Sequence, residues 1–303
     1  MPYPARSRRI PETLAAALSA LALIGCSDDA GDYTASGSAP AAARPAPRAL
    51  PPLFKPKGPA PAIVGKSAIV LDARSGKVLY QKNADLQRPV ASTQKLLTAM
   101  VIIDSGGLGE RVSVASSDTW VEPTKLYLKP GQSYRKSDLV AALLVRSGND
   151  VARCLARNHS GSEEAFALAM NAKARRLGMF SSNFKNPHGL TSGGQYSTAR
   201  DMGKLGLAAY RSRTVRSITS IKQLPFRFAD GRVVTYSNTN KVLHRSPYCN
   251  GLKTGYTRAS GRCLISSGKN GSREVVVVVL GSTTASIWND SQKMLHWALG
   301  VTS

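Results

Sequence analysis

Three short groups of polar residues occur in a fixed order along this chain, and together they could carry out acyl transfer. They are Ser92-Thr93-Gln94-Lys95, Ser147-Gly148-Asn149 and Lys253-Thr254-Gly255. Taken singly, each group is common by chance and favours a structural interpretation as a helix cap, a turn or a strand end. The ordered combination is far more specific, because it is typical of an acyl-transferase with an active-site serine.

The first group pairs a hydroxyl with an amine. A serine hydroxyl is a poor nucleophile near neutral pH and needs a base within hydrogen-bond reach. Lys95 follows Ser92 by three residues, so on a helix the two side chains lie on the same face. A lysine acts as a base only when its pKa falls from about 10.4 toward neutrality, and burial beside a second cation lowers it. Lys253 could be that cation. We therefore predict Ser92 as the nucleophile and Lys95 as its base.

The other two groups would complete a polar ring around a substrate. The Ser147 hydroxyl can pass a proton between a lysine and a leaving amine, and the Asn149 amide can donate to a substrate carbonyl while its oxygen holds a lysine. On a strand at Lys253-Thr254-Gly255, the cation and the hydroxyl would bind a carboxylate, and the glycine would allow close approach. The backbone N–H groups of Ser92 and Tyr256 would surround an oxyanion.

Sequence periodicity predicts the elements that position these groups. Alternating apolar residues on either side of Ser75-Gly76 predict a β-hairpin, and an apolar run over 95–103 predicts a helix with Ser92 at or near its N-terminus. Together these elements predict a mixed α/β fold in which helices pack around an antiparallel sheet. Further helices are expected over 137–155 with a break at 147–149, 163–177, 197–210 and 286–299, and further strands over 223–228, 233–236, 251–254, 262–266 and 275–280.

The N-terminus resembles an export signal. A basic segment with three arginines precedes an apolar run over 14–24, which is too short to span a bilayer. The run ends in Leu23-Ile24-Gly25-Cys26, which resembles a bacterial lipobox. Residues 1–25 are therefore predicted to be a lipoprotein signal peptide, and Cys26 the lipidated residue of an exported protein anchored to a membrane in the periplasm. The alternative is an ordinary secretory signal in which Cys26 is incidental.

Two further regions follow this signal. Residues 26–61 are rich in Ala, Pro, Gly and Ser, and the prolines exclude a regular helix or ladder. We expect a flexible tether that extends at about 3 Å per residue. Residues 62–303 are expected to form the folded domain, since a hydrophobic content of 42% allows a sizeable core.

Charge and composition limit the possible partners. The net charge of +23 would suit nucleic acid, an anionic envelope polymer or a lipid surface, or it could be a solvated basic face. The basic residues are spread in ones and twos and no nucleic-acid motif is present, so we expect no nucleic-acid partner. No H-E-x-x-H or clustered Cys/His pattern indicates a metal, and no cofactor is expected.

Three cysteines lie within the predicted domain. Cys154 falls in an apolar helical pattern and is expected to be a small buried residue. Cys249 and Cys263 flank Lys253, and on a hairpin they could form a disulfide in an oxidising compartment. Two free buried thiols are the alternative, and the sequence leaves both open.

Longer segments around the three groups resemble the D-alanyl-D-alanine carboxypeptidase family of low-molecular-mass penicillin-binding proteins. The likeness extends over about 63–299. It implies the penicillin-recognising serine transferase fold, shared with β-lactamases, in which a five-stranded antiparallel sheet is flanked by helices. The segments that carry it are 89–100, 184–190, 195–202 and 251–257.

The resemblance also implies roles and a substrate. Ser92 would be the acylated nucleophile, Lys95 the proton acceptor and Lys253 the substrate-binding cation, with Ser147 and Asn149 completing the site. The substrate would be peptidoglycan stem peptides that end in D-Ala-D-Ala, and β-lactam antibiotics would be covalent inhibitors.

Two departures from the family pattern bear on the activity. Many members carry a C-terminal β-rich domain and a membrane-binding helix, whereas this chain stops at Ser303, so a lipid on Cys26 would replace that anchor. The family usually places a carboxylate-binding arginine after the last strand, where this chain has Gly281-Ser282-Thr283-Thr284. The short form and the segment 240–264 are similar to members that act as endopeptidases on D-Ala crosslinks. The prediction is therefore a serine D-Ala-D-Ala carboxypeptidase, with a D,D-endopeptidase as the alternative.

Two other functions are disfavoured by the sequence. A β-lactamase with this nucleophile motif needs a glutamate that activates water, and Glu163 and Glu164 head an ordinary amphipathic helix. A catalytically inactive peptidoglycan-binding lipoprotein is disfavoured because every catalytic residue type is present. His188 lies in a turn, where we expect a structural or pocket-lining histidine rather than a base.

Overall fold

The computed structural model describes residues 55–301. The predicted signal peptide, Cys26 and most of the predicted tether lie outside the described residues. The helices are α1 (Lys95–Asp104), α2 (Lys136–Val145), α3 (Asn149–Ser160), α4 (Glu163–Arg176), α5 (Ala199–Arg211), α6 (Arg213–Thr219), α7 (Lys241–Arg245) and α8 (Ile287–Leu299), with 3-10 turns η1 (Ala91–Gln94) and η2 (Ser116–Thr119). The strands are β1 (Ser67–Asp72), β2 (Val78–Lys82), β3 (Arg111–Ser113), β4 (Ser133–Arg135), β5 (Gln223–Arg227), β6 (Val233–Ser237), β7 (Cys249–Thr257), β8 (Gly261–Asn270) and β9 (Arg273–Ser282).

A five-stranded sheet lies at the centre of the domain. Its strand order is β2-β1-β9-β8-β7, and each neighbouring pair is antiparallel. Alternate residues of a strand point to opposite faces, so Val276 and Val278 of β9 enter one core while Val277 and Val279 enter another. Both faces are covered, which explains why the valine run of β9 is apolar throughout rather than alternating. The predicted fold class is confirmed.

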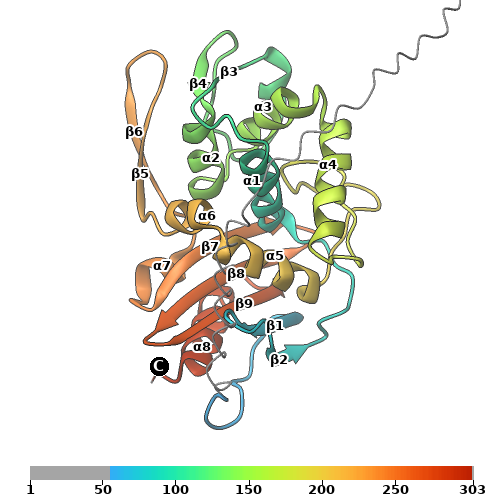
Figure 1. Cartoon of the computed structure of the whole chain (residues 1–303), viewed down its shortest axis with the longest axis vertical. Helices are drawn as coiled ribbons and strands as arrows, with labels where there is room; N and C mark the ends of the chain where they lie inside the picture. The colour runs from blue at the N-terminus through green and yellow to red at the C-terminus, as the bar shows by residue number, and fades with distance from the viewer. Residues whose placement is uncertain (1–54, 302–303) are drawn as a thin grey trace, which may run out of the picture. The chain divides into compact units, whose positions relative to one another are not determined.

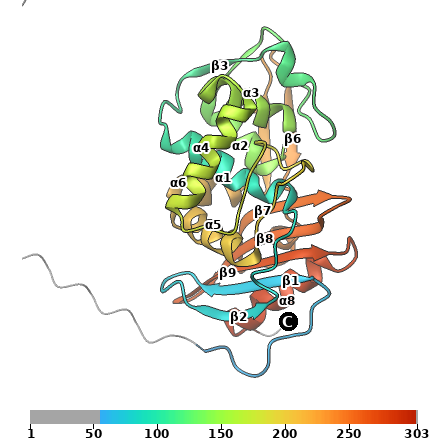
Figure 2. The same cartoon turned by 90° about the vertical axis from the view of Figure 1, so that its right-hand side faces the viewer.

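Helices form a layer on each face of this sheet. α8 packs on β8 and β9 from one side, while α5 packs on β1 and β9 from the other, as Figures 1 and 2 show. Helices α1 to α4 form a bundle beyond α5, with α1 at its centre. Eight of the ten residues of α1 are buried, as expected for a helix that is apolar on all sides. The helix that follows the predicted nucleophile Ser92 is thus fixed between the bundle and the sheet.

Several expectations need correction in detail. The strands predicted over 223–228 and 233–236 exist, but they form a separate two-stranded hairpin that extends beside the helices (Figure 1). The strand predicted over 251–254 is longer, as β7 begins at Cys249 and ends at Thr257. The disulfide alternative is wrong, because Cys154, Cys249 and Cys263 are all free and buried.

Candidate active site

Ser92 lies on the turn that leads into α1. It belongs to the 3-10 turn η1, and α1 begins three residues later at Lys95. The preceding residue, Ala91, has a left-handed φ of 49°, a conformation that costs energy for a residue with a side chain and is typical of functional sites. The Lys95 Nζ lies 2.8 Å from the Ser92 Oγ. The predicted contact between hydroxyl and amine is therefore present.

Lys95 is completely buried and its amine has a defined set of neighbours. Besides the serine oxygen, Nζ lies 2.7 Å from the Asn149 Oδ1 and 2.7 Å from the backbone carbonyl oxygen of His188. Those two oxygens can only accept, so a neutral amine donates its two N–H groups to them. The remaining lone pair then faces the hydroxyl of Ser92, which is the orientation that a general base needs.

The environment of Lys95 favours the neutral amine. Burial lowers its pKa well below the usual range, and the nearby Lys253 lowers it further, while Asp150 partly opposes both effects. The predicted influence of Lys253 is therefore present, but desolvation is the larger cause. The pKa of Lys253 itself falls to about 7 through burial. The two lysines thus form a buried pair in which neither amine is fixed as a cation at neutral pH.

The second group connects α2 to α3. Ser147 has a left-handed φ of 73°, which turns the chain sharply between the two helices. Asn149 is the first residue of α3, and its backbone N–H donates to the Thr124 carbonyl at 2.8 Å. Its side-chain amide donates to the Pro123 carbonyl. One amide hydrogen of Asn149 is thus committed to the chain, and the other is left for the substrate carbonyl that we predicted.

The third group lies on β7, which is an edge strand of the sheet. The Thr254 Oγ1 lies 2.7 Å from the Thr239 Oγ1, and the Lys253 Nζ donates to the Thr254 carbonyl at 3.2 Å. A Cβ on Gly255 would lie 2.8 Å from the backbone nitrogen of Ser92. Only glycine lets β7 pack this closely on the turn that carries Ser92, as predicted from its lack of a side chain. The Tyr256 ring is exposed.

These groups meet at a pocket with a volume of 410 Å³. Five of the eight predicted catalytic or substrate-binding residues line it, namely Ser92, Ser147, Thr254, Gly255 and Tyr256. The other three, Lys95, Asn149 and Lys253, are buried residues behind this lining. Cys26, the predicted lipidation site, lies outside the described residues.

Several residues at the site were not predicted. The pocket is also lined by Arg146, Lys241, Arg262 and Trp288, so three cationic side chains contribute to its lining. Arg262 stacks on Tyr256 with 4.4 Å between its guanidinium carbon and the ring centroid, and its Nε donates to the Thr284 Oγ1 at 3.2 Å. Arg262 comes from β8, whereas Arg146, Lys241 and Trp288 come from the ends of helices α2, α7 and α8. Only tertiary packing brings these elements together, so no local sequence pattern indicated that the four residues share one pocket.

Asp150 is a second omission. Its carboxylate accepts from the backbone N–H groups of Leu126 and Leu128 and so holds the preceding loop on α3. The signal was available, because an acidic residue in the first turn of a helix directly follows the second motif. Helix-dipole reasoning alone explains such a residue, which is why it was not singled out.

Other kinds of site are absent from the described part of the chain. Within residues 55–301, no three His, Cys, Asp or Glu side chains gather in a cluster that could hold a metal ion. No helix in that range is both long enough and apolar enough to cross a membrane. Glu163, which a β-lactamase reading would need at the pocket, instead binds Arg153 and His188 behind it.

Comparison with known proteins agrees with this fold. The family model described as D-alanyl-D-alanine carboxypeptidase matches residues 55–284. The chain therefore belongs to this family. The crystal structure of a D-alanyl-D-alanine carboxypeptidase from Mycobacterium tuberculosis H37Rv superposes with a TM-score of 0.77 at 31% identity, covering 82% of this chain and 97% of that one.

Some of the similar proteins are named carboxypeptidases and others endopeptidases. Carboxypeptidase DacF of Bacillus subtilis is 32% identical over 239 residues, which cover 77% of this chain and 61% of DacF. The D-alanyl-D-alanine endopeptidase of Escherichia coli K12 is 34% identical over 225 residues, covering 73% of this chain and 72% of the relative. The chain spans about three fifths of the length of the first curated carboxypeptidases that it matches.

Proposed function

We propose that this protein is a serine-type D-Ala-D-Ala carboxypeptidase that acts on peptidoglycan stem peptides through an acyl-enzyme on Ser92. One observation carries the proposal: the buried Lys95 amine lies 2.8 Å from the Ser92 Oγ, with its other two contacts made to carbonyl-type oxygens. This is the arrangement of a nucleophile and an oriented base. Membership of the carboxypeptidase family supplies the substrate class.

The acylation step follows from these contacts. Lys95 takes the hydroxyl proton as the Ser92 oxygen attacks the carbonyl carbon of the penultimate D-Ala. The backbone N–H groups of Ser92 and Tyr256 stabilise the resulting oxyanion. The proton then passes from Lys95 through the Ser147 hydroxyl to the leaving nitrogen, and terminal D-Ala departs as a neutral amine. Water attacks the ester in the second step, releases the shortened peptide and restores the Ser92 hydroxyl.

Arg262 fills the role of the arginine that is missing after the last strand. Its Nε donates to the Thr284 Oγ1, so its guanidinium lies beside the segment where the family's arginine is expected. It lines the same pocket as Ser92 and Thr254. A substrate carboxylate at this end of the pocket would meet Arg262 and the Thr254 hydroxyl. Lys253 of β7 adds positive potential in its protonated form.

Endopeptidase action on D-Ala crosslinks is the second candidate. It is favoured by the similarity to the Escherichia coli endopeptidase, of which this chain covers 72%. The cationic residues Arg146 and Lys241 in the pocket lining also suit a larger leaving group that carries a carboxylate. In this reaction the leaving amine would belong to a second stem peptide rather than to free D-Ala, and the chemistry at Ser92 would be unchanged.

Mass spectrometry of muropeptides distinguishes the two activities. The domain is incubated with a mixture of uncrosslinked pentapeptides and D-Ala-crosslinked dimers, with Ser92→Ala as the control. Loss of one alanine from the pentapeptides identifies a carboxypeptidase, and conversion of dimers to monomers identifies an endopeptidase. If neither substrate changes, a non-catalytic peptidoglycan-binding module becomes the favoured function. Covalent labelling of Ser92 by a fluorescent penicillin tests the proposed inhibitor class in the same preparation.

We also propose that the protein is a lipoprotein of the bacterial periplasm. The lipobox-like Leu23-Ile24-Gly25-Cys26 supports lipidation of Cys26 after removal of residues 1–25, with residues 26–61 as the tether to the domain. Metabolic labelling with a fatty-acid probe should give a labelled protein that the Cys26→Ser variant lacks. An unlabelled wild-type protein would mean that the signal is an ordinary secretory one.

A further inference from the structure

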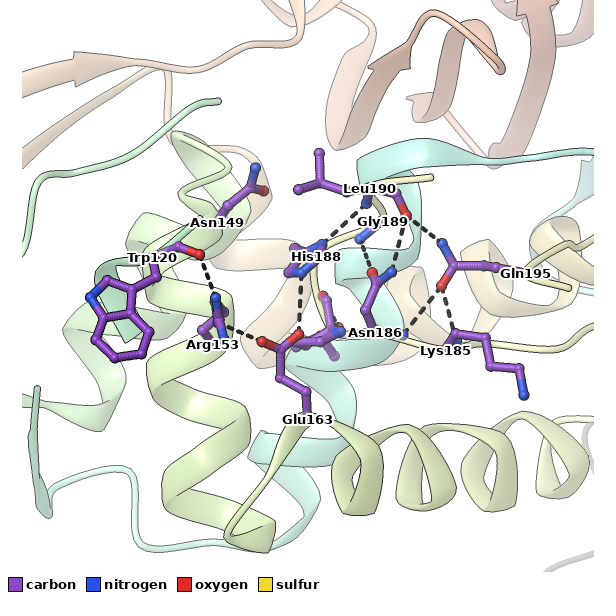
Figure 3. A network of polar contacts seen from close by, with 12 residues as sticks. Trp120, Asn149, Arg153, Glu163, Lys185, Asn186, His188, Gly189, Leu190 and Gln195 are labelled. Atoms are coloured by element: carbon purple, nitrogen blue, oxygen red, sulfur yellow. Dashed lines mark hydrogen bonds and ion pairs between the residues drawn. The ribbon is translucent and has the colours of Figure 1, made fainter. Parts of the chain in front are cut away.

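The imidazole of His188 is held between two fixed partners. Its Nε2 lies 3.2 Å from the Glu163 Oε2, and its Nδ1 accepts from the backbone N–H of Leu190 at 3.2 Å (Figure 3). The side chain is buried, with 7% of its surface exposed. His188 is therefore oriented on both sides of its ring, although the ring is not among the groups that line the pocket.

These contacts define the protonation of the ring. The Leu190 N–H can only donate, so Nδ1 must carry a lone pair rather than a proton. The hydrogen of the neutral ring then lies on Nε2 and is donated to Glu163. Burial lowers the pKa of the imidazole, and the charges of Lys95 and Arg153 act in the same direction against the opposing effect of Glu163. Burial, Lys95 and Arg153 thus favour a neutral ring. The Glu163 carboxylate opposes the fall in pKa, but by accepting from Nε2 it favours the Nε2–H tautomer of the neutral ring.

Glu163 is itself held in place. The Arg153 Nε lies 2.5 Å from its Oε1, and the Arg153 Nη1 donates to the Trp120 carbonyl at 2.6 Å, as Figure 3 shows. One carboxylate oxygen thus binds arginine from α3 while the other binds His188. Side chains at both ends of this contact are mostly buried, at 24% exposed for Arg153 and 19% for Glu163. The carboxylate has no freedom to reorient without losing a partner.

The backbone carbonyl of His188 contacts the side chains of Lys95 and Ser92. Its carbonyl oxygen lies 2.7 Å from the Lys95 Nζ and 3.2 Å from the Ser92 Oγ. On the other side of the turn, the Asn186 Oδ1 accepts from the Gly189 N–H at 2.8 Å. The ring contact with Glu163 and the Asn186 contact thus both restrain the peptide between His188 and Gly189.

We propose that Glu163 is a positioning residue for acylation: by binding the His188 ring, it fixes the carbonyl oxygen that directs the Lys95 lone pair at Ser92. The inference rests on the proposed nucleophilic role of Ser92. A displaced carbonyl would free one N–H of Lys95, and the amine could then rotate its lone pair away from the hydroxyl. Glu163 touches neither substrate nor reacting atoms, so its effect is transmitted entirely through His188.

Glu163→Gln tests the proposal with an isosteric change. The glutamine has one acceptor oxygen, which can face Arg153 or the His188 Nε2–H but not both, so one contact is lost. We expect the acylation rate constant with a fluorescent penicillin to fall about tenfold to a hundredfold, since small misplacements of a base have effects of this size. The dissociation constant of the initial non-covalent complex should not change, because the pocket lining is intact. Glu164→Gln removes the exposed neighbouring carboxylate and should stay within about twofold of wild type.

A double-mutant cycle shows whether the effect passes through the ring. His188→Ala keeps the backbone carbonyl but removes the imidazole, so Glu163→Gln should cause no further loss in that background. Additive losses would overturn the proposal, because Glu163 would then act independently of His188. A Glu163→Gln rate within about twofold of wild type would overturn it as well. Failure of wild-type protein to be acylated would instead contradict the proposed function.

The protonation of the His188 ring can be measured in wild-type protein, so this test does not require Glu163→Gln to fold. The imidazole nitrogen spectrum of wild-type protein, assigned with His188→Ala, should show one neutral tautomer with the hydrogen on Nε2. An Nδ1–H tautomer or a charged ring at neutral pH would overturn the proposal even if Glu163→Gln does not fold. In a folded Glu163→Gln variant, the Nε2 signal should move because its carboxylate acceptor is gone.

Discussion

The two sides of Ser92 are built differently. Behind the hydroxyl, the Lys95 amine is completely buried and meets the Asn149 oxygen and the His188 carbonyl oxygen at 2.7 Å each. In front of it, a pocket of 410 Å³ is bordered by long side chains such as Arg262 and Trp288. The rear side is a closed set of hydrogen bonds, whereas the front side is open and cationic.

The difference separates two properties of the site. Groups with one fixed geometry determine how reactive the hydroxyl is, because a base must be aimed to work. Long side chains at an open pocket determine which substrate binds, because they can adjust to its shape and charge. Changes behind Ser92 should therefore lower the rate with every acyl donor, and changes in front should act on some substrates more than on others.

The largest expected effect is loss of the base. Lys95→Met keeps the length of the side chain but removes the amine, and we expect acylation by penicillin to fall by roughly 10²–10⁴-fold. Stopped-flow fluorescence with a labelled penicillin measures the rate. If Lys95→Met slowed acylation by penicillin but not by peptide substrates, the groups behind Ser92 would not determine the general reactivity of its hydroxyl.

The next largest effect should come from Gly189, which packs against the turn that carries Ser92. Gly189 has a φ of 88°, and a Cβ there would lie 2.3 Å from the Ala91 carbonyl oxygen. Gly189→Ala should displace the turn that carries Ser92 and lower acylation by about a hundredfold. Gly193→Ala is the matched control, because its Cβ would meet no atom within 4 Å. Equal rates for both variants would show that the turn tolerates displacement.

A smaller and selective effect is expected in front of Ser92. Arg262→Gln removes the proposed carboxylate partner, which should lower kcat/KM for a peptide ending in D-Ala-D-Ala by about tenfold. The corresponding peptide amide, which has no carboxylate, should be affected much less. Arg258→Gln changes an exposed arginine that does not line the pocket and is the control. Equal losses for the acid and the amide would show that Arg262 affects the reactivity of Ser92 rather than recognition of the substrate carboxylate.

The smallest expected effect is a pH dependence of the unfolding free energy, which we attribute to the buried Lys253. Its pKa is lowered to about 7 by burial, whereas an unfolded lysine titrates near 10.4. Between these values the unfolded chain binds more protons, so the unfolding free energy should rise as the pH rises from about 7 to about 10.4. Lys253→Met removes this dependence and should raise Tm below pH 7, by about 2–4 °C for each kcal/mol of relieved desolvation.

Thermal denaturation of wild type and Lys253→Met over this pH range measures the difference. The two Tm values should converge as the pH rises above about 10.4, where the wild-type amine is neutral in both states. A constant difference across the range would show that packing rather than charge separates the variants. The same variant should lose substrate binding, so the lysine is retained at a cost in stability.

The sequence was informative where chemistry resides in side chains. Ser92, Lys95 and Lys253 could be grouped because each has a distinctive residue type, and the contact of the first two follows from helix periodicity. The apolar run of β9 and the amphipathic pattern of α4 were equally clear. Short elements such as α7, with five residues, give no periodic signal and were missed.

The remaining parts of the site could not be predicted for physical reasons. The His188 carbonyl that binds Lys95 is a backbone group. Every residue has such a carbonyl, so residue type does not indicate which one will bind the lysine. The place of Arg262 in the pocket depends on the pairing of Tyr256 with Arg262 across β7 and β8, and register is a property of the folded sheet. The partnership of Glu163 with His188 joins residues from α4 and a loop that only packing brings together.

The three buried thiols have a practical consequence. Burial raises the pKa of Cys154 to about 12 and those of Cys249 and Cys263 to about 11, so almost no thiolate exists at physiological pH. Thiolate is the species that oxidants and exchange reagents attack. The described domain therefore needs no oxidant to mature and no reductant to remain intact. Once folded, the domain keeps the same covalent structure in a reducing or an oxidising solution.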